Sequence, residues 1–145
     1  MDAPLFTHIA IRCADLDRSI SFYREWCGLE VLHQRADPSA DGHGVIRVAW
    51  VGRRPRNGGN PAFVIVLLEP HARPGPTSLF DHLGFALDSR AAVDALAARA
   101  QAAGLLHWSA EDHGPVVGYL CAVQDPDGNV VEFSHGQHLG TAEGA

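Results

Sequence analysis

Residues 125–135 read DPDGNVVEFSH, a turn followed by a strand that carries one acidic side chain. Asp-Pro-Asp-Gly has the composition of a type I turn, because proline fixes the dihedral at the second position and aspartate and glycine suit the first and last. Side chains alternate along the strand, so Glu132 shares a face with Val130 and Ser134. A buried carboxylate among apolar residues is costly unless it is paired or bound to a cation. The sequence therefore predicts a partner for Glu132.

The first part of the chain predicts a strand followed by a helix. Residues 5–12 alternate in the manner of a strand, and Asp15 or Asp17 can cap the helix that follows. Apolar residues then recur at helical spacing until Gly28, which ends the helix. Three further strands are expected over residues 29–33, 45–51 and 62–69.

The same order of elements begins again near residue 80. Residues 80–85, FDHLGF, correspond to residues 6–11, FTHIAI, at a constant offset of 74 positions. Ser89 is expected to cap a second helix and Gly104 to end it. Strands follow, of which the last two are expected over residues 116–123 and 129–135. The chain is thus predicted to be an α+β protein of one domain, residues 1–145, with module one over 5–69, a proline-rich linker over 70–79, module two over 80–136 and a tail over 137–145.

This βαβββ repeat points to a metal site. His8 and His82 hold equivalent positions, so we expect them to face one another across whatever cavity the halves enclose. Ala10 and Gly84 share their faces and are small, which leaves space beside the imidazoles. Two imidazoles and the Glu132 carboxylate form the 2-His-1-carboxylate ligand set for a divalent ion with open positions. The alternative is that both histidines are hydrogen-bonded core residues and Glu132 is half-exposed.

Composition excludes several other classes of function. A formal net charge of -6, from 17 acidic and 11 basic residues, gives no basic face for nucleic acid and no polybasic anchor for a membrane. We see no signal peptide or membrane-spanning stretch, so a cytoplasmic location is expected. Cys13, Cys27 and Cys121 have irregular spacing, which favours core residues over disulfides or a thiolate zinc site.

Three stretches carry a family resemblance: THIAIRCADLDRSISFYREWCGLEV, DHLGFALD and DPDGNVVEF. They resemble the vicinal oxygen chelate superfamily, which includes glyoxalase I, extradiol dioxygenases, fosfomycin-resistance thiol transferases and bleomycin-resistance proteins. The resemblance covers residues 5–136. It implies two βαβββ modules that form an open, curved mixed sheet around a central cavity, with a divalent metal ion bound by His8, His82 and Glu132. It also implies a homodimer, and leaves open whether one chain or two build each site.

Departures from the family patterns bear on the reaction. Glyoxalase I adds a glutamate ligand in module one, but alignment of the strand cores places Val66 opposite Glu132. Glu69 is three residues further on and falls on the opposite face unless a bulge intervenes. His113 fits a histidine of the extradiol dioxygenase pattern and is our candidate general acid or base. Ala122 stands where that pattern has a tyrosine, and a surface loop is the alternative place for His113.

These observations predict a divalent-metal enzyme that acts on a small substrate with vicinal oxygens, dioxygenase-like rather than glyoxalase I itself. The ion is left open among Fe(II), Mn(II), Ni(II) and Zn(II). A lyase or isomerase of the glyoxalase type is one alternative. Another is a metal-free ligand-binding protein like the bleomycin-resistance members, with a groove lined by tryptophans. Core or module-interface positions are the favoured prediction for these tryptophans, which are Trp26, Trp50 and Trp108. Fosfomycin thiol transfer ranks low, because the chain has no lysine.

Overall fold

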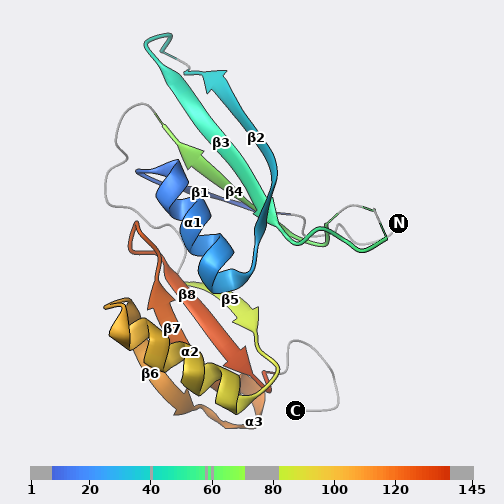
Figure 1. Cartoon of the computed structure of the whole chain (residues 1–145), viewed down its shortest axis with the longest axis vertical. Coiled ribbons are helices and arrows are strands. Elements are labelled where there is room, and N and C mark those ends of the chain that lie inside the picture. Colours follow the sequence, from blue (N-terminus) through green and yellow to red (C-terminus); the bar gives the residue numbers. More distant parts are fainter. Residues whose placement is uncertain (1–7, 40, 58, 60, 71–81, 138–145) are drawn as a thin grey trace. The chain divides into compact units, whose positions relative to one another are not determined.

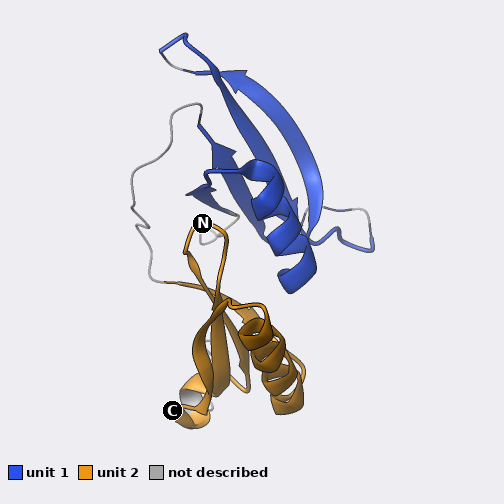
Figure 2. Cartoon of the chain, turned by 60° about the vertical axis from the view of Figure 1, so that its left-hand side comes forward, with its two compact units in different colours: residues 1–78 blue, residues 79–145 orange. Residues whose placement is uncertain are grey.

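The computed structural model describes residues 8–39, 41–57, 59, 61–70 and 82–137. The chain divides into two compact units, Met1–Ser78 (unit 1) and Leu79–Ala145 (unit 2), which Figure 2 colours separately. In the described ranges each unit has four strands in one mixed sheet and one long helix. The predicted α+β class with two βαβββ modules is therefore confirmed.

Unit 1 has the strand order β1-β4-β3-β2, in which β1 runs parallel to β4 and the other pairs are antiparallel (Figure 1). The Asp15 carboxylate caps α1 by accepting the Arg18 N–H at 3.0 Å, which selects Asp15 over Asp17 as the cap. Gly28 ends the helix in the left-handed conformation that glycine adopts without strain. The elements are β1 (His8–Arg12), α1 (Leu16–Cys27), β2 (Glu30–Pro38), β3 (Val45–Gly52) and β4 (Val64–Glu69).

Unit 2 repeats this arrangement with the strand order β5-β8-β7-β6. The Ser89 hydroxyl caps α2 by accepting the Ala92 N–H at 3.1 Å. The elements are β5 (His82–Ala86), α2 (Arg90–Ala102), β6 (Leu106–Asp112), α3 (Gly114–Val117), β7 (Tyr119–Gln124) and β8 (Val130–His135).

Strand register gives the correspondence between the two units residue by residue. Directly paired residues share a face of the sheet, so each chain of pairs forms a row across four strands. The row in unit 1, from β1 to β2, is Ala10, Val66, Trp50 and His33. The row in unit 2, from β5 to β6, is Gly84, Glu132, Ala122 and Trp108. Val66 therefore occupies in unit 1 the place that Glu132 occupies in unit 2.

The helix packs against the face opposite this row in each unit. In unit 1, Ile65 and Leu67 are almost fully buried, and in unit 2 Val131 and Phe133 are. The three cysteines are also buried and unbridged, as predicted for core residues. Burial raises the pKa of the Cys121 thiol to about 11, so this thiol is neutral near pH 7 and is a poor metal ligand.

The tryptophans depart from the predicted core positions. Trp50 and Trp108 are 40% and 39% exposed, so neither is a core residue, and the module-interface position that the sequence also favoured stays a prediction. Both lie in the rows defined above, on the face of the sheet opposite to the one that packs against the helix. Trp26 on α1 is partly buried.

Several predicted boundaries need correction. The strand expected over residues 116–123 begins only at Tyr119, because Pro115 lies in the first turn of the short helix α3. The strand expected over 29–33 extends to Pro38, because β3 pairs with it along its whole length. Residues 5–7, 71–79 and 138–145 of the predicted first strand, linker and tail lie outside the described residues. Within the described part of the chain, no helix is both long and apolar enough to span a membrane.

Candidate metal centre

Glu132 lies in the middle of β8, on the face away from α2, with its side chain only 6% exposed. Its neighbours in the row are small: Gly84 on β5 and Ala122 on β7. A β-carbon added to Gly84 would lie 3.9 Å from Glu132 Oε1, in ordinary van der Waals contact. Small residues on both sides therefore leave room beside the carboxylate for other groups.

His82 provides the partner that the sequence predicted for Glu132. Its Nε2 lies 3.5 Å from Glu132 Oε2, and its side chain is 37% exposed. Nitrogen and oxygen ligands bind a divalent transition metal at roughly 2.0–2.2 Å, so two adjacent ligands lie about 3 Å apart. A spacing of 3.5 Å is close to this value and is longer than a good hydrogen bond. The pair fits two adjacent positions around one ion.

The indole ring of Trp108 lies beside His82. Its ring centroid lies 5.9 Å from that of His82, with the ring planes at 75°. Since β5 and β6 are the two outer strands of the sheet, this contact requires the indole to extend over the sheet face toward His82. The His107 ring also contacts the indole, with the ring centroids 5.2 Å apart.

His8 lies on β1 of unit 1, paired with Val64, as His82 on β5 is paired with Val130. The strand register thus matches the offset of 74 positions that the sequence predicted. In the described ranges no group of three or more histidine, cysteine or acidic side chains is arranged to hold a metal ion. The structure brings His82 and Glu132 together within unit 2, and the ligand role of His8 stays a prediction.

His113 lies just before α3 and is exposed, with Nε2 3.7 Å from Glu111 Oε2. Asp112, the residue before His113, pairs with Tyr119, which pairs with His135 on β8. His135 lies three residues along β8 from Glu132, which is roughly 10 Å. No described contact joins His113 to Glu132. The sequence left a surface loop open as the alternative place for His113, and its exposed position before α3 agrees with that alternative. An acid–base role for His113 stays a prediction.

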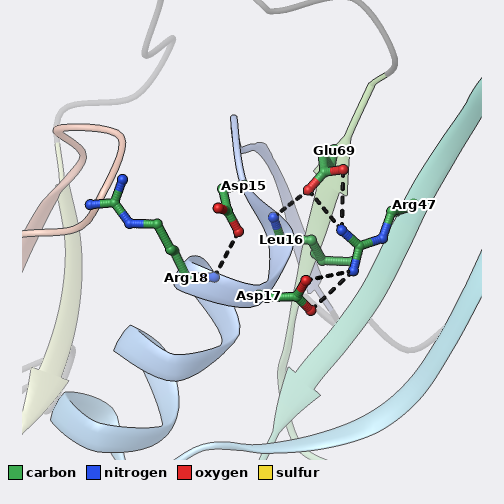
Figure 3. A network of polar contacts seen from close by, with 6 residues as sticks. All are labelled: Asp15, Leu16, Asp17, Arg18, Arg47 and Glu69. Carbon is green, nitrogen blue, oxygen red and sulfur yellow. Dashed lines mark hydrogen bonds and ion pairs between the residues drawn. The ribbon is translucent and has the colours of Figure 1, made fainter.

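Glu69 lies on the face that packs against α1, opposite to the face of Val66. Its carboxylate accepts the backbone N–H of Leu16 and pairs with Arg47 at 3.2 Å, while Arg47 also binds Asp17 at 2.9 Å (Figure 3). The hydrogen bond to Asp17 is the largest of the causes that raise the pKa of Arg47. Glu69 therefore holds the N-terminal end of α1, and the predicted parity is correct.

Gln137 is a neighbour of Glu132 that sequence reasoning missed. Its Nε2 donates a hydrogen bond to Glu132 Oε1 at 3.3 Å, and its Oε1 accepts one from Ser134 Oγ at 3.4 Å. The sequence signal is Gly136, which turns the chain at the end of β8 with φ 75°. That turn brings Gln137 back beside the strand.

Comparison with known proteins places the chain in a family. The model of the Glyoxalase/Bleomycin resistance protein/Dioxygenase superfamily matches residues 5–133. An uncharacterized protein of Pseudomonas aeruginosa is 44% identical over 140 residues, which are 95% of this chain and 93% of that protein.

Solved structures share the fold of this chain. The trypanothione-dependent glyoxalase I of Leishmania major superposes with a TM-score of 0.68 at 22% identity, over 92% of this chain and 88% of that one. TnmS3, an antibiotic binding protein from Streptomyces sp. CB03234, superposes with a TM-score of 0.62 at 26% identity, over 93% of this chain and 98% of that one. The chain belongs to the Glyoxalase/Bleomycin resistance protein/Dioxygenase superfamily.

Proposed function

We propose that this protein is a divalent-metal-dependent enzyme that acts on a small molecule with two neighbouring oxygen atoms. His8, His82 and Glu132 are its metal ligands. The observation that carries the proposal is the approach of His82 Nε2 to Glu132 Oε2 at 3.5 Å, next to residues too small to fill the space.

The pair His82 and Glu132 combines an imidazole with a carboxylate, a donor set that suits Fe(II), Mn(II), Ni(II) or Zn(II). When bound, such an ion supplies Lewis acidity and stabilises negative charge on substrate oxygens. The protein contributes a nearly buried carboxylate, an imidazole that reaches solvent and an indole wall at Trp108. These groups orient a substrate that enters over Gly84 and Ala122.

Dioxygenase-like chemistry is favoured over that of glyoxalase I by two observations in unit 1. Val66 stands at the position equivalent to Glu132, so no carboxylate occupies it. The nearest carboxylate along β4, that of Glu69, is bound to Arg47 and to the start of α1 on the other face. A three-ligand site leaves more positions for substrate and dioxygen than a four-ligand site.

Metal content tests this proposal. The native chain, purified without chelator, should hold stoichiometric metal by mass spectrometry, and His82→Ala, His8→Ala and Glu132→Ala should each retain less than about a tenth of it. His43→Ala is the matched control, because His43 lies in an exposed loop of unit 1. Equal and negligible metal in all five proteins would refute the proposal.

A metal-free binding protein is the second candidate function. The exposure of Trp50 and Trp108 favours it, because aromatic faces bind planar ligands, and TnmS3 is an antibiotic binding protein of the same fold. A thermal-shift screen with and without chelator separates the two candidates. Ligand shifts that persist in chelator support the binding protein, whereas shifts that require metal support the enzyme.

We further propose that the protein forms a homodimer, since superfamily members are often dimers. We also propose that it is cytoplasmic. Light scattering coupled to gel filtration measures the first property. A mass near 15.5 kDa, that of one chain, would contradict it.

A further inference from the structure

We propose that Gln137 is a positioning residue for Glu132. Its amide holds Glu132 Oε1, so that the other carboxylate oxygen, Oε2, is the one presented toward His82. This inference rests on the proposed function, because the contact leaves Oε2 of Glu132 as the single oxygen that faces a metal ion.

The backbone after β8 makes this contact possible. The strand ends at His135, and Gly136 has φ 75°, a conformation that reverses the chain at little cost only for glycine. The returning segment packs directly on Gly118, where an added β-carbon would lie 2.5 Å from His135 O and 2.9 Å from Gln137 N. Two glycines thus place Gln137 beside the strand that it has just left.

Hydrogen bonds then fix the orientation of the Gln137 amide. Ser134 Oγ donates to Gln137 Oε1 at 3.4 Å, which directs Gln137 Nε2 toward Glu132 Oε1 at 3.3 Å. On the other side of the same carboxylate, Oε2 lies 3.5 Å from His82 Nε2. The two carboxylate oxygens therefore have different partners, Gln137 for Oε1 and His82 for Oε2.

Residues that hydrogen-bond to a metal ligand orient that ligand and so raise the affinity for the metal. Their loss lowers metal affinity roughly 10- to 100-fold. Gln137→Met keeps the length of the side chain and removes both the donor and the acceptor. We expect this variant to bind Co(II) roughly 10- to 100-fold more weakly in competition with a chelator, and to alter the Co(II) absorption bands as the carboxylate rotates. Gln101→Met, an exposed change on α2, is the control and should leave both unchanged.

A measurement on metal-free protein separates this proposal from the proposed function. If Gln137 holds Glu132, the change in melting temperature of the Gln137→Met, Glu132→Met double variant should differ from the sum of the two single changes, because each change removes the hydrogen bond. Additive changes would overturn the proposal whether or not the native chain binds metal. If the changes in melting temperature are not additive but the native chain binds no Co(II), the contact is supported and the proposed function is refuted. The proposed role of Gln137 would also be overturned if Gln137→Met bound Co(II) with the affinity and the absorption bands of the native chain.

Discussion

Unit 1 and unit 2 pair their strands in the same order and the same register, but the equivalent rows carry different side chains. In unit 2 the row contains the Glu132 carboxylate, with Ala122 beside it. In unit 1 the same two positions hold the apolar residues Val66 and Trp50. A duplicated scaffold can thus carry a carboxylate in one copy at a position where the other copy has an apolar residue.

The units also differ in how polar side chains attach the helix to the sheet. In unit 1 Arg47 and Glu69 hold the start of α1. In unit 2 the hydroxyl of Tyr119 on β7 donates to Asp94 on α2 at 2.5 Å, and the guanidinium of Arg90 lies 4.8 Å from the centre of the Tyr119 ring. The Glu69 contacts in unit 1 are partly buried, whereas the Tyr119 contact with Asp94 in unit 2 lies at the surface.

The largest expected effect comes from giving unit 2 the residue of unit 1. Glu132→Val should weaken Co(II) binding by at least about 100-fold, more than the loss of a residue behind a ligand. The metal-free variant should be as stable as the native chain or more so, because an apolar residue often replaces a buried charge at no cost. Chelator competition and urea unfolding measure the two quantities. Glu111→Val, an exposed change in the same unit, is the control, and native affinity in Glu132→Val would remove the basis of the comparison.

The second prediction tests whether Glu69 serves the helix rather than a metal. Glu69→Ala should lower the free energy of unfolding by about 2 kcal/mol, because it removes charged hydrogen bonds to Arg47 and to the N-terminal end of α1. Asp17→Ala should cost less than about 1 kcal/mol, because the Asp17 side chain is 72% exposed. Urea unfolding measures both changes. Metal content should be unchanged in Glu69→Ala, and its loss would make Glu69 a ligand.

Much of the scaffold could be predicted because it depends on local chemistry and parity. The Asp15 and Ser89 caps need only a short polar side chain before a helix, and both form. The face of Glu69 follows from the alternation of side chains along β4. The match between Val66 and Glu132 follows from aligning the two strands, and the register confirms it.

The parts that could not be predicted depend on contacts between distant residues. The exposure of Trp50 and Trp108 reflects which face of the sheet α1 and α2 leave uncovered, whereas their aromatic side chains had favoured core or module-interface positions. The contact of Gln137 with Glu132 depends on the turn at Gly136 and on its packing against Gly118. No residue pattern indicates where such a returning chain ends.

A third prediction concerns the two exposed tryptophans. Trp108→Ala should weaken Co(II) binding roughly two- to tenfold, because an aromatic pair is worth about 0.5–1.5 kcal/mol and the indole helps to orient His82. Trp50→Ala should leave the affinity unchanged, because its described ring contacts are with His33 and Arg35 in unit 1. Chelator competition measures both. Equal losses in the two variants would mean that the tryptophans act alike despite their different rows.

The smallest effect distinguishes the two helix attachments by their response to alkaline pH. The hydrogen bond that Tyr119 donates to Asp94 raises the pKa of Tyr119 above its ordinary value of 10.0. A group with a raised pKa in the folded state stabilises that state fully below the unfolded pKa, and the contribution is lost as pH rises through the folded pKa. Asp94→Asn should therefore lower the pKa of Tyr119, followed by absorbance at 295 nm with Tyr119→Phe to assign the signal. The attachment in unit 1 should persist over the same pH range, because the hydrogen bond to Asp17 raises the already high pKa of Arg47. An unchanged titration curve in Asp94→Asn would show that this hydrogen bond does not attach α2 in solution.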